Sequence, residues 1–153
     1  MDLILWRHAD AKEGGHDLPD HDHPLSAKGE RQAAKIARWL NLHLPDSARV
    51  LISPTLRTRQ TAEGLERRKR VMEALGPQET VDALLHAARW PDAREAVVVV
   101  GHQPTLGYTA AYLLAGVTQP WPVRKGALWW IKRRERDGQV ETLLHASLTA
   151  EHV

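Results

Sequence analysis

The chain has 153 residues, of which 42% are hydrophobic and 26% are charged, as expected for one soluble globular domain spanning residues 1–153. It contains no cysteine, which excludes disulfides, thiolate zinc sites and a cysteine nucleophile, and which fits a reducing compartment. The net charge of +2 suits small acidic substrates at least as well as nucleic acid. No apolar run approaches the roughly 20 residues that span a bilayer and no signal peptide is recognisable, so we expect a cytoplasmic protein that binds no membrane.

A short buried strand is predicted at the N-terminus, where the apolar run Leu3–Trp6 stops abruptly at Arg7 and His8. In open α/β sheets, ligands bind in the crevice beyond the carboxyl ends of the strands. Arg7 and His8 are therefore candidate active-site residues. A strand that merely surfaces there, with a solvated arginine and histidine, is the alternative that this stretch alone leaves open.

Residues 11–25 are predicted to form a loop, because they are rich in glycine, proline, aspartate and histidine. Clustered imidazole and carboxylate groups can bind zinc or iron. The regular spacing with which a helix or strand fixes such ligands is absent here, so we expect no metal cofactor. The possible ligands in this loop are His16, Asp17, Asp20, His21, Asp22 and His23.

An amphipathic helix is predicted over 26–42, with Ser26 as its N-cap and an apolar face at helical spacing. A second strand over 48–52 leads directly into Ser53 and Pro54, which we interpret as the N-cap and the first-turn proline of another helix. Arg57 would lie in or near the first turn of that helix. A strand, a tight turn and a helix N-terminus in succession form a natural anion site.

The charge run over 66–70 is interpreted as a solvated face of the same helix rather than a stripe that binds nucleic acid. Gly76 and Pro77 would end that helix. A third strand is predicted over 80–85, followed by a loop or a short helix over 86–94.

The clearest strand in the sequence covers 95–100, where four consecutive valines indicate a central parallel strand buried on both faces. It ends at Gly101 and His102. A further helix is predicted over 105–115, closed by Gly116.

The C-terminal part is predicted to be a hairpin, with strands over 127–132 and 142–147 joined around Asp137-Gly138. Trp129 and Trp130 should then point to opposite faces of their strand. Taken together, these elements predict a three-layer α/β domain with a mostly parallel central sheet, helices on both faces and a C-terminal hairpin.

Three of the predicted strands end in polar residues that would bring Arg7, His8, Arg57 and His102 to one crevice. Arginine presents a planar fork that matches phosphate oxygens bidentately. One histidine can accept a phosphoryl group on a ring nitrogen, and the second can stabilise the charge of the group in transfer. The sequence contains no Walker-type glycine loop, so nucleotide binding by that route is not expected.

Four motifs, met in order along the chain, resemble signatures of the histidine phosphatase superfamily, also called the phosphoglycerate mutase-like superfamily. Residues 5–11 resemble its R-H-G signature, and 24–29 resemble its P-L-T-x-x-G helix start. Residues 53–62 are similar to its S-P-x-x-R-A-x-Q-T-A block, and 99–102 are similar to its late strand that ends in histidine. The small size and the R-H-x-D-A start most resemble the SixA-type phosphohistidine phosphatases.

The resemblance implies a role for each of four residues. His8 matches the nucleophilic histidine that becomes phosphorylated, Arg7 and Arg57 match the two arginines that clamp the phosphate, and His102 matches the second histidine of the pocket. The resemblance implies a phosphorylated protein as the partner. We expect no cofactor, because the arginines already supply positive charge to the phosphoryl group, and no nucleic-acid partner. The oligomeric state stays open.

Two residues depart from the family pattern. Ala9 replaces the usual glycine of R-H-G, and it requires either an ordinary φ or a strained backbone. His23 stands where the family often has arginine, which weakens any role of the loop in holding substrate. We expect Ser53 to cap a helix rather than to bind phosphate, and Arg59 to point away from the crevice.

The nature of the leaving group is inferred from the stretch 81–89. The esterases and mutases of the superfamily resemble one another in placing an acid in this region, but His86 follows Leu84-Leu85 here, and Asp82 lies inside the predicted strand. His86 is a possible accessory acid, because histidine titrates near neutral pH. An imidazole leaving group tolerates a missing acid, so we expect phosphohistidine as substrate.

Two other functions remain open. One is a broader phosphomonoesterase or a mutase of the same superfamily. The other is a basic module that binds nucleic acid through 67–70 and 132–136, which would give binding with a steep salt dependence.

Overall fold

The computed structural model describes residues 1–13 and 17–153, and these form a six-stranded sheet in the order β3-β2-β4-β1-β5-β6. The first four strands in this order pair in parallel, and the last two are added antiparallel. The strands are β1 (Asp2–Arg7), β2 (Arg49–Ile52), β3 (Arg68–Val71), β4 (Val97–Gly101), β5 (Leu128–Arg136) and β6 (Gln139–Leu148). The predicted α/β class with a mostly parallel sheet is confirmed.

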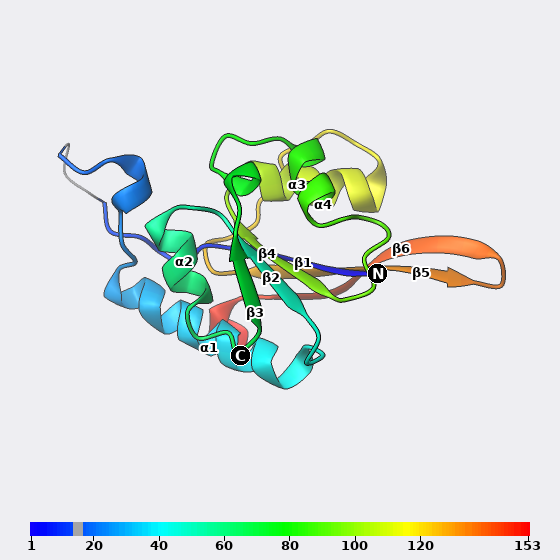
Figure 1. The fold of residues 1–153 in the computed structure, drawn as a ribbon, viewed down its shortest axis with the longest axis horizontal. Coiled ribbons are helices and arrows are strands. Elements are labelled where there is room, and N and C mark those ends of the chain that lie inside the picture. The colour runs from blue at the N-terminus through cyan, green and yellow to red at the C-terminus, as the bar shows by residue number, and fades with distance from the viewer. Residues whose placement is uncertain (14–16) are drawn as a thin grey trace.

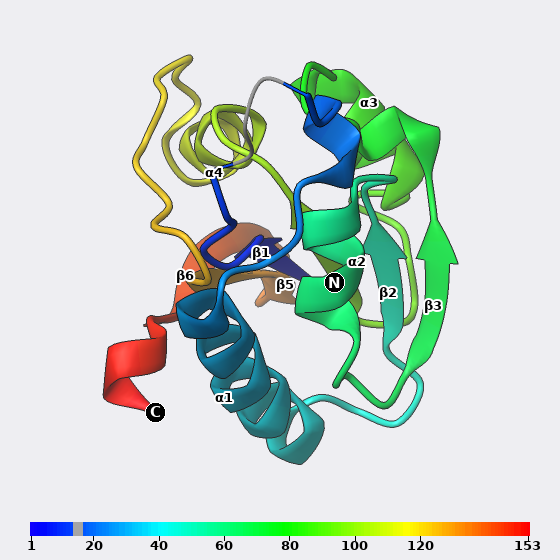
Figure 2. The same ribbon diagram turned by 90° about the vertical axis from the view of Figure 1, so that its left-hand side faces the viewer.

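Helices cover both faces of the sheet, as Figures 1 and 2 show. Helices α1 and α2 lie on one face, and α3 and α4 lie on the other. The helices are α1 (Ala27–His43), α2 (Leu56–Ala62), α3 (Val81–Ala87) and α4 (Thr105–Ala115), with short 3-10 turns at Asp20–Asp22, Glu73–Leu75 and Ala150–His152. The predicted helices over 26–42 and 105–115 are confirmed.

The alternation of side chains along β1 divides the core into two halves. Ile4 and Trp6 pack toward α1, whereas Leu3 and Leu5 pack toward α3 and α4, and all four side chains are fully buried. The valines of β4 are also fully buried on both faces, which confirms the predicted central strand. Burial on both faces explains why β1 and β4 read as unbroken apolar runs.

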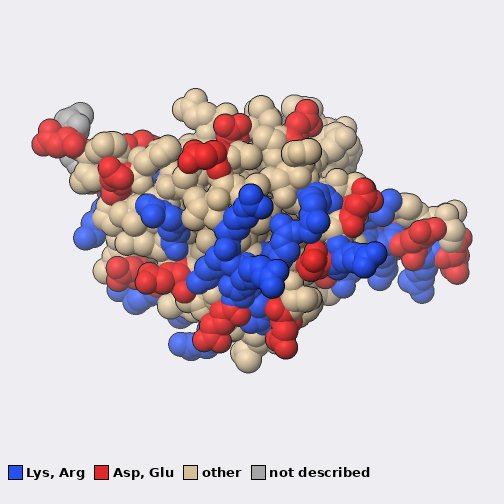
Figure 3. Space-filling model, viewed as in Figure 1, with Lys and Arg blue, Asp and Glu red and all other residues tan. Residues whose placement is uncertain are grey.

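Helix α2 ends at Ala62, so the prediction that the charge run 66–70 continues this helix is wrong. No apolar residue occurs within that run, and a helix without a buried face gains little from packing. Arg68–Val71 instead form β3, an exposed edge strand parallel to β2. Figure 3 shows lysine and arginine gathered over this part of the surface. Charge on an edge strand discourages pairing with other chains.

The strand predicted over 80–85 is also wrong, because these residues begin α3. The side chain of Thr80 caps this helix by accepting the N–H of Ala83 at 3.1 Å. Leu84 and Ala87 are three residues apart and both are buried, which is the spacing of a helix. A short apolar run fits either structure, and the cap residue was the signal that favours the helix.

The C-terminal hairpin is confirmed, with strands longer than predicted. Asp137 and Gly138 have φ values of 52° and 77°, as a two-residue turn between right-twisted strands requires. Trp129 and Trp130 pack against the two different halves of the core, as predicted. None of the helices in the described residues is long and apolar enough to cross a membrane.

Candidate active site

The carboxyl ends of β1, β2 and β4 lie side by side at one edge of the sheet. The N–H of His8 donates to the carbonyl of Gly101, and the N–H of Ser53 donates to the carbonyl of Val100, each at 3.1 Å. The ladder of backbone hydrogen bonds therefore extends one residue past β1 and β2 and holds His8 and Ser53 against β4. The ring centroids of His8 and His102 are 5.3 Å apart. The structure thus brings together the two histidines that sequence analysis singled out.

The ring of His8 is oriented by its own backbone neighbour. Its Nδ1 lies 2.8 Å from the carbonyl oxygen of Ala9, and the residue is only 8% exposed. A carbonyl can only accept, so Nδ1 carries the proton and Nε2 carries the free lone pair. This is the tautomer that a nucleophilic Nε2 requires.

His102 is held by a residue whose role sequence analysis missed. Its Nε2 lies 2.7 Å from the hydroxyl of Ser53, which is fully buried. The prediction of Ser53 as a helix cap is wrong: Thr55 caps α2 by accepting the N–H of Thr58. Ser53 still belongs to the β2–β4 ladder, so the first helical turn begins later. One pattern in the sequence could have predicted this contact. Ser53 directly follows one buried strand, and His102 directly follows the strand beside it.

The guanidinium of Arg57 is buried and faces the loop that precedes α1. Its Nη1 donates to the backbone carbonyl of Asp20 at 2.8 Å, and its Nη2 donates to the Asp20 carboxylate at 3.2 Å. Burial opposes ionisation of Asp20, but the charge and hydrogen bond of Arg57 leave the pKa of this carboxyl lowered. The Asp20 side chain is 64% exposed, so this ion pair is weak.

Arg7 emerges from β1 beside the same site. Its Nη1 donates to the carbonyl of Val123 at 2.9 Å. Its Nε is buried and has no hydrogen-bond partner among the described residues. Burial lowers the pKa of this guanidinium, because loss of solvent disfavours its charged form.

A hydrogen-bonded link joins the loop after β1 to α2. The N–H of Ala9 donates to the hydroxyl of Thr61 at 3.0 Å, and that hydroxyl donates to the carbonyl of Arg57 at 2.7 Å. Ala9 is not among the residues with positive φ, and its side chain packs beside Leu25 in a small cluster. Alanine therefore replaces the family glycine without backbone strain.

The start of α1 also supports this loop. Ser26 caps the helix as predicted by accepting the N–H of Gly29 at 3.0 Å, and it donates to the Asp10 carboxylate at 2.7 Å. A Cβ at Gly29 would collide with the backbone carbonyl of Asp10. Only glycine lets the first turn of α1 approach the loop this closely, which explains the glycine of the 24–29 motif.

Both histidines are held in their neutral form. Burial lowers the pKa of His8 to about 4, with a smaller contribution from the charges of Arg57, Arg7 and Lys125. Burial lowers the pKa of His102 to about 3, with smaller contributions from His8 and Arg57. Neutral imidazole at physiological pH keeps the Nε2 lone pair of His8 available.

The rings of His8 and His102 should both titrate well below the usual pKa of histidine. Proton NMR titration of the free protein should give midpoints far below 6.5 for both rings, near 4 for His8 and near 3 for His102. Between pH 6.5 and about 4 the unfolded chain binds protons that the folded chain does not, so the free energy of unfolding should fall as pH drops through this window. A midpoint at 6.5 or above for either ring would contradict the described burial.

The two accessory acids considered from the sequence do not line the small cavity beside His102. Asp82 and His86 are exposed on α3, and neither lines the small cavity that contains Gly101 and His102. Glu79 does line that cavity, and its backbone carbonyl accepts the hydroxyl proton of Thr105 at 2.8 Å. Sequence analysis missed Glu79 because only the stretch 81–89 was searched for an acid, and Glu79 lies just before it.

The histidine- and aspartate-rich loop holds no metal-like cluster in its described part. Within residues 1–13 and 17–153, no group of three His, Asp or Glu side chains is arranged to hold a metal ion. His16 lies outside the described residues. Asp20 contacts Arg57, and His23 lies 3.1 Å from the carbonyl of Leu18 through Nε2. The loop therefore reaches the site through Asp20.

Two arginines, two neutral histidines and the strand ends that carry them form a site that can be compared with known families. The model of the histidine phosphatase superfamily (branch 1) matches residues 3–84. The chain belongs to the histidine phosphatase superfamily. Within this family it is 32% identical over 129 residues to the phosphohistidine phosphatase SixA of Escherichia coli, covering 78% of each protein.

Two other relatives extend this comparison. An uncharacterised protein of Picosynechococcus is 37% identical over 128 residues, which covers 77% of this chain and 76% of that protein. A solved structure of the protein histidine phosphatase SixA complexed with tungstate superposes with a TM-score of 0.77 and 27% identity. That superposition covers 98% of this chain and 97% of the solved one, so the two proteins share their fold over nearly the whole length of both chains.

Proposed function

We propose that this protein is a phosphatase that hydrolyses phosphohistidine on a protein substrate, with His8 as the residue that becomes phosphorylated. The observation that carries the proposal is the ring of His8, which is buried, neutral and anchored through Nδ1 beside Arg7, Arg57 and His102. The similarity to SixA proteins supports the same substrate class, and the tungstate in a solved relative is a tetrahedral oxyanion like phosphate.

The reaction proceeds in two displacements at phosphorus. The Nε2 lone pair of His8 forms a bond to phosphorus while the bond from phosphorus to the substrate imidazole breaks, and the leaving imidazole takes a proton from solvent. Water then attacks the phosphorus of phospho-His8, inorganic phosphate leaves, and neutral His8 is restored. Arg7, Arg57 and His102 bind the three non-bridging oxygens in both steps, and the otherwise unsatisfied Nε of Arg7 provides one donor.

The group that leaves phosphorus differs between the two substrate classes, an alkoxide from a phosphomonoester and an imidazole from phosphohistidine. An alkoxide needs a proton as it departs, and a positioned general acid typically contributes about 10²–10⁴-fold. Asp82 and His86 are exposed on α3, and neither lines the cavity beside His102. An imidazole is a far better leaving group than an alkoxide, so phosphohistidine suits a site without such an acid.

A comparison of two substrates tests this proposal. We expect kcat/KM for a phosphohistidine peptide to exceed that for a phosphomonoester such as phosphoserine peptide by about 10²-fold or more, the contribution of the missing acid. The Asp82→Ala and His86→Ala variants should keep the ratio. A preference of the wild-type protein for the monoester would contradict the proposal.

The second candidate function is a broader phosphomonoesterase of the same superfamily. One observation favours it, namely the position of Glu79 in the small cavity that also contains His102. Glu79→Gln separates the two functions. Loss of monoester hydrolysis in this variant, with phosphohistidine hydrolysis unchanged, would identify Glu79 as a general acid for alkoxide leaving groups.

The reaction should need no divalent metal. Arg7 and Arg57 already supply positive charge to the phosphoryl oxygens, which is the part that a metal ion plays in many phosphoryl-transfer enzymes. We expect turnover to be unchanged after dialysis against a chelator and after addition of Mg²⁺ or Zn²⁺. Activity that disappears with the chelator and returns with one metal would assign a catalytic role to an ion.

A further inference from the structure

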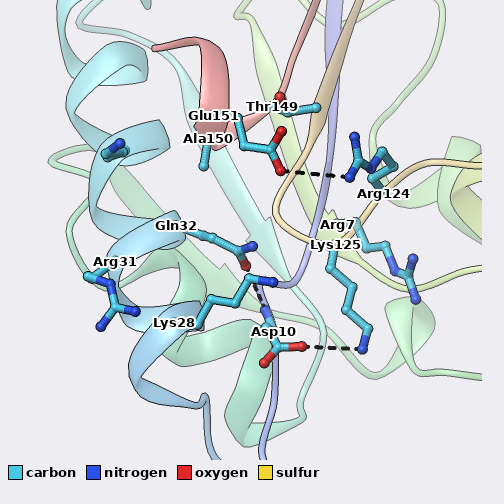
Figure 4. Close-up of a pocket in the computed structure, with 11 residues that line it drawn as sticks. Arg7, Asp10, Lys28, Arg31, Gln32, Arg124, Lys125, Thr149, Ala150 and Glu151 are labelled. Carbon is cyan, nitrogen blue, oxygen red and sulfur yellow. Dashed lines mark hydrogen bonds and ion pairs between the residues drawn. The ribbon is translucent and has the colours of Figure 1, made fainter.

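A broad groove lies beside the candidate active site and is shown in Figure 4. It has a volume of about 560 Å³ and lies between α1, the loop before β5 and the C-terminal turn. Six cationic residues line it against two acids, Asp10 and Glu151, which leaves an excess of four positive charges. The cations are Arg7, Lys28, Arg31, Lys35, Arg124 and Lys125.

The groove is continuous with the reacting centre. Arg7 belongs both to the groove and to the candidate phosphate clamp. The loop that carries Lys125 runs beside His8, because the N–H of the next residue, Gly126, donates to the carbonyl of His8 at 3.0 Å. The charge of Lys125 also contributes to the lowered pKa of His8, which places this lysine within electrostatic reach of the ring.

The positive charge in the groove is only partly neutralised. Lys125 lies 3.4 Å from the carboxylate of Asp10, and Arg124 lies 3.7 Å from that of Glu151. Both acids of the groove are thereby occupied. The three groove cations that belong to α1, Lys28, Arg31 and Lys35, form no ion pair within the described part of the chain.

The three cations of α1 that line the groove form a row on one side of the helix. Lys28 and Lys35 are seven residues apart, which corresponds to about 10 Å along the helix axis. The acid of α1, Glu30, lines a different hollow on the α2 side. An ordinary solvated helix face mixes both signs, whereas here one sign faces the groove. A row of cations about 10 Å long is longer than a single phosphate group, and it can contact several carboxylates spaced along a protein surface.

We propose that this groove binds acidic side chains of the phosphorylated protein substrate while its phosphohistidine occupies the site, an inference that rests on the function proposed above. Substrate recognition then has two parts. Arg7, Arg57 and His102 bind the phosphoryl group, and the row on α1 selects the surroundings of the phosphohistidine by charge.

The test uses three phosphoramidate substrates and two triple variants. The substrates are a phosphohistidine peptide flanked by glutamates, the same peptide with glutamines, and the phosphoramidate ion, which has no flanking groups. The groove variant is Lys28→Gln, Arg31→Gln, Lys35→Gln. The matched control is Arg68→Gln, Lys69→Gln, Arg70→Gln on the exposed edge strand β3, whose hollow contains no residue of the candidate site.

We expect the wild-type protein to prefer the glutamate peptide by about tenfold in kcat/KM, since three exposed ion pairs contribute a factor of about two each. The preference should appear in KM, weaken with added salt and disappear in the groove variant. The β3 control variant should keep the preference for the glutamate peptide. The wild-type protein, the groove variant and the β3 variant should all hydrolyse the phosphoramidate ion at the same rate.

Equal kcat/KM for the two peptides in the wild-type protein would overturn the groove inference and leave the proposed function intact. An equal loss of preference in the groove and β3 variants would also overturn it, because the effect would then reflect net charge alone. Failure of the wild-type protein to hydrolyse any of the three substrates would overturn the proposed function, and the groove inference with it.

Discussion

Replacing His8 with alanine should abolish turnover of phosphohistidine, lowering kcat by about 10⁴-fold or more, as removal of a covalent nucleophile does in other enzymes. The reason is specific to this ring: its Nδ1–H donates to the carbonyl of Ala9 at 2.8 Å, so only its Nε2 is available to phosphorus. The other histidine of the site, His102, does not take its place, because its Nε2 is hydrogen-bonded to Ser53. Steady-state kinetics with a phosphohistidine peptide measures the loss.

A second histidine provides the matched control. His43 lies at the end of α1 and places its Nδ1 2.7 Å from the carbonyl of Trp39, so its local geometry resembles that of His8. It is exposed and remote from the strand ends. His43→Ala should keep full activity, and both variants should keep the circular dichroism spectrum of the wild-type protein. Near-normal turnover in a folded His8→Ala protein would remove His8 from the mechanism.

Replacing Arg57 with alanine should reduce kcat/KM by about 10²–10³-fold, on the scale of about 3–4 kcal/mol that one oxyanion donor contributes to a transition state. Arg57 is buried, and its two Nη groups already hold two oxygens of Asp20 in the geometry of a fork. The same fork can bind two phosphoryl oxygens. Because a lysine cannot reproduce two parallel donors, Arg57→Lys should recover only part of the loss.

Arg59 is the matched control for this variant. It lies two residues along the same helix and is exposed, and its Nε lies 3.4 Å from the carbonyl of Thr55. Arg59→Ala removes the same charge from α2 without reaching the site, so kcat/KM should change by less than about twofold. A loss in Arg59→Ala equal to that in Arg57→Ala would show that α2 contributes only through its net charge.

The positions of the candidate site residues were predicted more accurately from the sequence than the secondary structure of the segments around them. Two strands buried on both faces, β1 and β4, appear as unbroken apolar runs, and each stops at a histidine. Parallel strands end at the same edge of a sheet, so the meeting of His8 and His102 can be expected from the pattern alone. Arg57 lies in the first turn of α2, as expected, because the turn after β2 leads into this helix.

The sequence-based predictions that proved wrong concern segments whose local pattern fits a helix and a strand equally well, or contacts between residues far apart in the chain. The residues of β3 carry charge, and charge is common both on helix faces and on edge strands. The short apolar run at 81–85 fits a strand or a helix, and tertiary packing of Leu84 decided for the helix. The bond between Ser53 and His102 joins residues 49 positions apart, and no local propensity encodes such a contact.

The most direct test of the central claim is rapid acid-free quenching of the protein during turnover, followed by mass spectrometry of its peptides. A phosphohistidine linkage survives base and is lost in acid, so the digestion is kept alkaline. The account predicts one phosphoryl group on the peptide that contains His8, formed and lost at rates compatible with kcat, and absent from His8→Ala. Normal turnover without phosphate on His8, or with phosphate on another residue, would contradict it.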